Sequence, residues 1–118
     1  MAENFKKELN DNVDGIRWSI KRDTIERFIT LLKCNMIKKS QIGIRSGKMS
    51  REDIYNNLES FRMDLLENVL LEEANELEND ITDVLDWLLE EVYKTRIFSG
   101  IDIEYVDDRK YLSFSWSA

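Results

Sequence analysis

The chain has 118 residues, of which 42% are hydrophobic and 35% are charged, with a net charge of −7, one cysteine and no histidine. This length and apolar content predict one folded domain over residues 1–118 and exclude a disordered chain. The absence of histidine excludes Ser-His and Cys-His nucleophile pairs and His-rich zinc sites. Cys34 has no partner for an internal disulfide.

The expected location is the cytoplasm, without membrane association. The opening MAENFKK lacks the apolar region of a signal peptide, and no stretch of the chain reaches the length of a membrane span. A single thiol also fits a reducing compartment.

Charge divides the chain into two halves of opposite sign. Residues 1–50 carry a balance of +5, whereas residues 51–118 carry −12. Such an asymmetry indicates either a charged partner or pairing of the two halves with each other.

The first half predicts two helices followed by a loop. A short helix is expected over residues 3–12, with Trp18 and Ile20 anchoring the link to the next one. Apolar residues then recur every three or four positions, and Asp23 is a candidate N-cap, so a second helix is expected over 23–38. The segment SQIGIRSGKMS, residues 40–50, is rich in glycine and serine and predicts a loop.

The second half predicts a long helical region over residues 51–95. Ser50 followed by Asp53 is typical of a helix start, and apolar positions keep three-and-four spacing from Met63 to Val92. An unbroken helix of this length would span about 67 Å, against about 35 Å for a compact domain. We therefore expect a break or bend, with Asn56-Asn57 and Asn79-Asp80 as the candidate positions.

After Gly100 the apolar spacing changes from helical to alternating, which predicts an antiparallel β-hairpin over residues 101–116. IDIEYV and YLSFSW each place apolar side chains on one face, and DDRK supplies the turn between them. The expected fold class is therefore mainly α (α+β), a helical domain with a C-terminal antiparallel β-hairpin.

The acidic stretch is the main functional signal in the sequence. Residues 63–93 contain eleven acids and no Lys or Arg, and like charges on one helix repel each other. We interpret it as a binding face for a basic protein partner, because ordered carboxylates can compete for a phosphate-binding groove and steer association. The candidate partner-binding residues are Glu72, Glu76, Asp83, Asp86, Trp87, Glu90, Asp107, Asp108 and Tyr111.

Two resemblances to known families bear on this interpretation. The segment GIDIEYVDDRKYLSFSW is similar to acidic strand-turn-strand segments with exposed aromatics in colicin-type bacterial immunity proteins, which implies inhibition of a nuclease toxin. EEANELE followed by DITDVLDWL resembles the acidic motifs of MazG-like all-α nucleotide pyrophosphohydrolases. That second resemblance implies magnesium binding by Glu73-Glu76 and Asp80-Asp83, or Asp83-Asp86, although the family places its two motifs on separate helices.

The favoured expectation is a non-enzymatic immunity protein with no cofactor and no bound metal. The alternatives are a phage-encoded nucleic-acid mimic that inhibits a restriction or CRISPR nuclease, the MazG-like enzyme, and an acidic helix that is simply solvated. Nucleic acid is not an expected partner because the chain carries −7. A homodimer is an additional expectation, with Lys33, Lys38 and Lys39 pairing with the acidic helix within one copy or between copies.

Overall fold

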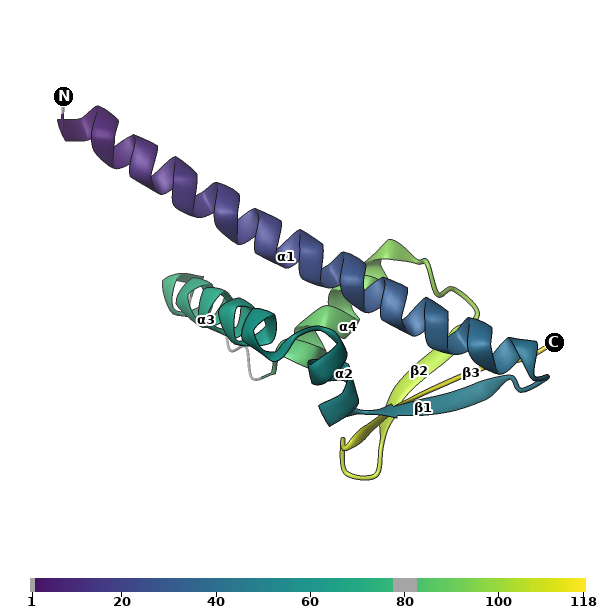
Figure 1. The fold of residues 1–118 in the computed structure, drawn as a ribbon. Helices are drawn as coiled ribbons and strands as arrows, with labels where there is room; N and C mark the ends of the chain where they lie inside the picture. The colour runs from purple at the N-terminus through teal and green to yellow at the C-terminus, as the bar shows by residue number, and fades with distance from the viewer. Residues whose placement is uncertain (1, 78–82) are drawn as a thin grey trace.

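The computed structural model describes residues 2–77 and 83–118, and for residues 2–3 and 75–77 it describes the backbone only. The described residues form four helices and one three-stranded antiparallel sheet (Figure 1). In chain order these elements are α1 (Ala2–Gln41), β1 (Ser46–Ser50), α2 (Arg51–Asn57), α3 (Ser60–Leu77), α4 (Val84–Thr95), β2 (Ile101–Val106) and β3 (Tyr111–Trp116). The expected fold class, mainly α with a C-terminal hairpin, is confirmed.

Helix α1 replaces the two separate helices expected over residues 3–12 and 23–38. Asp23 lies inside this helix and does not cap it. The intervening Trp18 is exposed and stacks under the Arg22 guanidinium at 4.6 Å, while Ile20 is partly buried. The apolar residues of the two segments lie on different faces of this one helix. The helix continues between them because no proline interrupts the backbone.

The expected break within residues 51–95 is present, although the molecule is 64 Å long and is not the compact domain on which that expectation was based. Helix α2 starts where it was expected, because the Ser50 hydroxyl accepts a hydrogen bond from the Asp53 N–H at 3.0 Å. It ends at Asn57, and Glu59, with φ 66°, turns the chain into α3. Helix α4 begins after Asp83, whose carboxylate accepts from the Leu85 N–H at 2.9 Å. The second proposed break, Asn79-Asp80, lies outside the described residues.

The sheet contains one strand more than the expected hairpin. Strands β2 and β3 pair through the turn at residues 107–110, and β1 adds to the other side of β3, giving the order β1-β3-β2. Strand β1 lies inside the segment expected to be a loop. A Cβ at Gly47 would meet the Phe114 ring at 2.6 Å, so this glycine permits close strand packing, a role its local sequence does not reveal.

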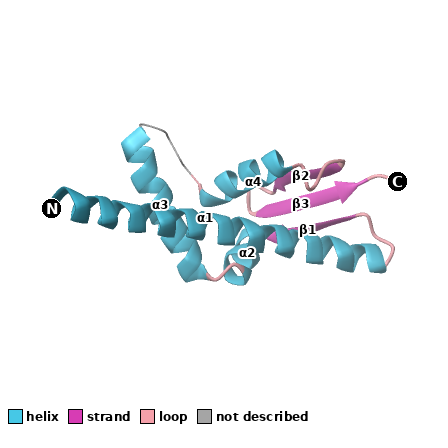
Figure 2. Ribbon diagram, turned by 90° about the horizontal axis from the view of Figure 1, so that it is seen from above, coloured by secondary structure: helices cyan, strands magenta, loops and turns pink. Residues whose placement is uncertain are grey.

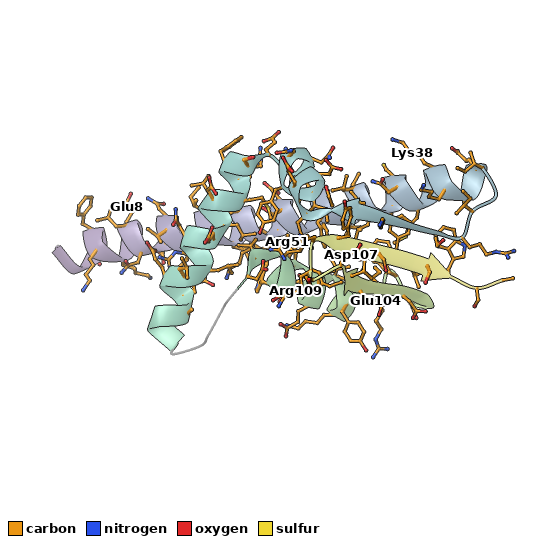
Figure 3. All side chains as sticks on the ribbon, turned by 90° about the horizontal axis from the view of Figure 1, so that it is seen from below. Glu8, Lys38, Arg51, Glu104, Asp107 and Arg109 are labelled. Atoms are coloured by element: carbon orange, nitrogen blue, oxygen red, sulfur yellow. The ribbon has the colours of Figure 1, made fainter. Side chains whose placement is uncertain are left out.

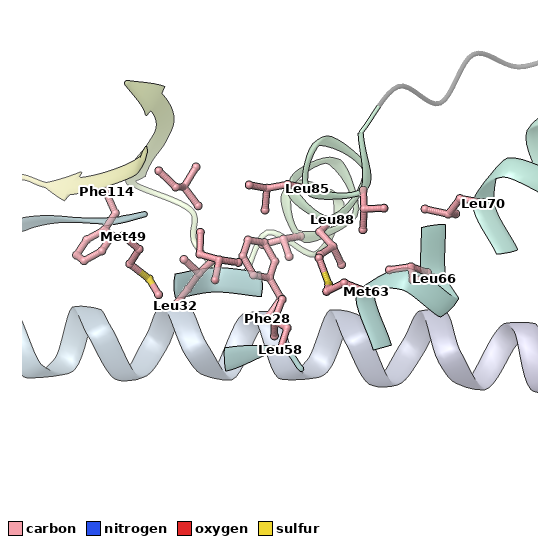
Figure 4. Packing of buried hydrophobic residues seen from close by; sticks show 14 of the residues in the cluster. Phe28, Leu32, Met49, Leu58, Met63, Leu66, Leu70, Leu85, Leu88 and Phe114 are labelled. Carbon is pink, nitrogen blue, oxygen red and sulfur yellow. The ribbon is translucent and has the colours of Figure 1, made fainter. Parts of the chain in front are cut away.

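Side chains from every helix and from the sheet share one buried cluster (Figure 4). Phe28 and Leu32 of α1 lie at its centre, and α2, α3 and α4 add mainly leucines. The sheet contributes Met49, Leu112 and Phe114. The apolar face of the hairpin therefore packs inward against the helices. This was expected, because an isolated hairpin is only marginally stable in water.

The molecule is elongated, with principal extents of 64 × 26 × 24 Å. Helix α1 runs along the long axis, with α3 crossing its first half and the sheet beside its second half (Figure 2). None of the described helices has the length and apolarity needed to cross a membrane.

Candidate protein-binding surface

The acidic residues of α3 lie opposite basic residues of α1. Arg17 forms an ion pair with Glu72, and Lys21 forms one with Glu73. These bases follow one face of α1 at a spacing of four, so a single helix face supplies both counter-charges. Part of the acidic potential predicted for this stretch is therefore neutralised within the chain. The side chain of Glu76 lies outside the described residues.

A second group of predicted residues belongs to an ionic cluster that joins α2, α4 and the hairpin. The Arg51 guanidinium donates to Asp83 at 2.6 Å. Asp86 accepts from the Tyr105 hydroxyl at 2.6 Å and from Arg109 at 2.5 Å. Figure 3 shows Arg51 and Arg109 close together near the middle of the molecule's long axis. The cluster holds three elements together, and its carboxylates face cations of their own chain.

The cluster shifts the ionisation of its members. Partial burial disfavours the charged form of Asp86, but hydrogen bonds from Tyr105 and Arg109 outweigh it and hold the pKa of Asp86 below its ordinary value. Burial, with the hydrogen bond to Asp86, raises the pKa of Tyr105 far above that of a free phenol. Asp86 is therefore an anion and Tyr105 a neutral donor across the physiological pH range.

The hairpin turn is exposed and partly charge-paired. Asp107, Asp108 and Arg109 all have positive φ between 53° and 67°, a conformation that Asp tolerates better than most residues. Asp107 lies 3.6 Å from Lys48, whose ammonium also stands 4.4 Å from the centre of the Tyr111 ring. Asp108 is exposed and has no ion-pair partner among the described residues. Tyr111 thus packs on β1 through Lys48.

Most of the predicted site residues that the structure describes are engaged within the chain. Trp87 packs partly buried against the core, Asp83 caps α4, and the carboxylates of Glu72, Asp83, Asp86 and Asp107 are paired. Glu90 and Asp108 remain exposed and unpaired within the described chain. The sequence shows that the acids lie on one helical stretch. It does not show that basic residues of α1, α2 and the hairpin turn form ion pairs with them in the folded chain.

An open groove between α4 and β2 collects residues that the sequence reasoning missed. It encloses about 1120 Å³. Its apolar lining is Leu89, Val92, Tyr93, Phe98, Ile101 and Ile103. Tyr93 is 84% exposed, the largest exposure of any large apolar side chain in the described residues. A solvated aromatic beside an apolar floor is the arrangement in which protein interfaces place their anchor residues.

Unpaired carboxylates border this groove. Glu90 and Asp102 line it, and Glu104 is the next residue on the same face of β2 (Figure 3). Lys94 is engaged by Glu91 at 3.1 Å, which leaves Arg96 as the cation on the rim without a described partner. The signal for Asp102 and Glu104 was present in the alternation of IDIEYV, whose polar positions are both acidic.

A second groove, of about 970 Å³, runs between α1, α2 and β1. Cys34 lies in it, exposed, beside Arg27 and Lys38. The lining alternates acids with bases, and Arg27 is paired with Glu59 at 3.5 Å. This groove has neither the apolar floor nor the aromatic anchor of the α4–β2 groove.

The described carboxylates of the MazG-like motif are also engaged. Glu73 pairs with Lys21, and Asp83 with Arg51. Within residues 4–74 and 83–118, where side chains are described, no three acidic or sulfur-bearing side chains gather in a way that could hold a metal ion. The remaining positions of the motif, Glu76 and Asp80, lie outside that set.

Comparison of the chain with protein-family models, curated proteins and solved structures finds no match in any of the three.

Proposed function

We propose that this chain is a non-enzymatic binding protein that captures a basic partner protein in the groove between α4 and β2. In its narrower form the proposal is an immunity protein that inhibits a nuclease toxin, as the hairpin's resemblance implied. A phage-encoded inhibitor of a restriction or CRISPR nuclease belongs to the same class and differs only in its partner.

The observation that carries the proposal is the exposed Tyr93 beside an apolar floor with unpaired carboxylates at the rim. Apolar and aromatic contacts supply most of the affinity of an interface, and rim charges supply orientation and association rate. Glu90 and Asp102 attract a basic surface, and Tyr93 provides an aromatic contact from which water is excluded when the partner binds. The paired acids of α3 and α4 contribute a diffuse negative field.

The sheet adds a feature suited to an extended partner segment. Strand β2 lies at the edge of the sheet in the order β1-β3-β2, and the described chain has no strand on its outer side. Edge strands offer backbone donors and acceptors to an added strand. A basic segment of the partner can pair with β2 while its alternate side chains enter the groove.

The experiment measures affinity for the protein encoded beside this chain's gene, by calorimetry at several salt concentrations. Tyr93→Ala and the double reversal Glu90→Lys/Asp102→Lys should each weaken binding at least tenfold, the second more strongly at low salt. The matched control reverses Asp64 and Glu67, two exposed acids of α3 that lie away from the groove. Equal weakening by the control, or no weakening by either groove variant, would refute this binding surface.

A further inference from the structure

The first half of α1 carries an apolar stripe that no other part of the described chain covers. Phe5, Leu9, Val13 and Ile16 follow one another at intervals of four, four and three, which places them on one helix face. Residues 4–16 are all exposed, with both Phe5 and Ile16 at 62%. Figure 1 shows this purple end of α1 extending away from the sheet and α4.

This segment is a poor helix on its own. The run NDNVDG, residues 10–15, contains two asparagines, two aspartates and a glycine, all of which favour the helix interior less than alanine does. A Cβ built on Gly15 meets nothing within 4 Å. Helices of about 15 residues are marginal in water even for favourable sequences, and tertiary packing normally stabilises them. The stripe is therefore expected to have a partner.

The exposed area of the chain matches the requirement of a stable dimer. The total accessible surface is 8370 Å², whereas a compact monomer of 14.0 kDa would expose about 6,700 Å². The excess is about 1,700 Å², and a standard interface buries about 800 Å² on each partner. A second copy seated on the stripe would account for about half of this excess.

Charge also favours a second copy over a strongly charged partner at this position. Residues 4–20 contain three bases, Lys6, Lys7 and Arg17, and three acids, Glu8, Asp11 and Asp14. The net charge of this segment is therefore zero, whereas the net charge of the whole chain is −7. Two copies can approach along this segment without net repulsion, provided that their acidic bodies remain apart.

We propose that the protein forms a homodimer in which the first halves of two α1 helices pair antiparallel through Phe5, Leu9, Val13 and Ile16. A register centred between residues 12 and 13 sets Leu9 against Ile16 of the second copy. The second halves of α1, and the bodies packed on them, then lie at opposite ends of the pair. The segment left uncovered in one copy becomes the core of the interface.

The antiparallel register also meets the acidic end of α3. Lys6 and Arg17 are eleven residues apart, about three helical turns, so they share one flank of α1. Equivalent flanks face each other in a two-fold antiparallel pair, which brings Lys6 of one copy beside Arg17 and Lys21 of the other. Those residues hold Glu72 and Glu73, and the Glu72 side chain keeps 64% of its surface exposed to accept a further cation.

Sedimentation velocity under reducing conditions, from about 1 to 100 μM protein, tests the pairing. The wild-type chain should sediment as a species of twice 14.0 kDa at 100 μM and shift toward 14.0 kDa at 1 μM, whereas the double variant Leu9→Asp/Ile16→Asp should be a monomer at both concentrations. Trp18→Gln is the matched control, because Trp18 is exposed on a different face of the same helix. A wild-type monomer at 100 μM, or equal disruption by Trp18→Gln, would overturn the proposal. Near-UV circular dichroism checks that each variant body remains folded.

The orientation has its own test in two neighbouring lysines. Lys6→Glu should weaken the dimer roughly five- to tenfold at low salt, since it is introduced twice beside Glu72 and Glu73. Lys7→Glu makes the same charge reversal at the next residue, whose side chain points about 100° away around the helix. It should change the affinity of dimerisation by less than about twofold. Equal effects of the two would contradict the antiparallel register. Because no other protein is present, this outcome is independent of the groove on α4 and β2.

Discussion

The two halves of α1 have similar backbones and opposite surroundings. In residues 24–36 the apolar side chains lie against α3, α4 and the sheet, and Phe28 and Leu32 are fully buried. In residues 4–16 a comparable apolar stripe remains in water. The same periodicity therefore marks the core of the fold in one half and a surface for association in the other.

Truncation of a phenylalanine in each half gives the largest contrast. Phe28→Ala empties a fully buried position and should lower the free energy of unfolding by about 3–5 kcal/mol. Phe5→Ala removes an exposed side chain and should change it by less than about 0.5 kcal/mol at sub-micromolar concentration. Urea unfolding followed by tryptophan fluorescence measures both. A large loss for Phe5→Ala under those conditions would show that the stripe is packed within one copy.

The two glycines Gly15 and Gly47 extend the contrast to the backbone. Gly47→Ala places a methyl group 2.6 Å from the Phe114 ring and should cost about 1–3 kcal/mol. Gly15→Ala meets open space in a helix and should stabilise its segment by about 0.5–1 kcal/mol. Thermal unfolding for the first and far-UV circular dichroism for the second give the readouts. Destabilisation by Gly15→Ala would mean that another surface closes on this face of α1.

Sequence reasoning reached the fold class, the hairpin and the start of α2 because each depends on local pattern. Period-two alternation defined β2 and β3, and the Ser50–Asp53 pair defined a cap. It missed β1, because five residues rich in serine and glycine become a strand only when β3 lies beside them. It did not identify which bases pair with the acidic stretch, since Arg17, Arg51 and Arg109 are 55, 32 and 23 positions away from their partners.

The ionic cluster distinguishes structural acids from surface acids. Asp86→Asn removes the charge that Tyr105 and Arg109 share, and should cost about 1–2 kcal/mol because two charge-assisted hydrogen bonds weaken. Glu72→Gln weakens a more exposed ion pair and should cost less than about 1 kcal/mol. Urea unfolding of the two variants compares them directly. If Glu72→Gln costs as much as Asp86→Asn, the cluster has no special structural role.

Acid should weaken the fold through the same residue. The folded pKa of Asp86 lies below its unfolded value, so its stabilisation is complete above the unfolded pKa and is lost as pH falls through the folded pKa. The midpoint of urea unfolding should therefore decrease between about pH 5 and pH 2, and the decrease should be smaller in Asp86→Asn. An identical pH profile in this variant would remove Asp86 from the explanation.

Amide hydrogen exchange at two protein concentrations tests the contrast between the halves of α1 most directly. Amides of residues 24–36 should exchange slowly and equally at 1 and 100 μM, because packing within one copy protects them. Amides of residues 4–16 should be protected at 100 μM and exchange rapidly at 1 μM, because a second copy covers them only at the higher concentration. Strong protection of residues 4–16 that does not depend on concentration would contradict the account.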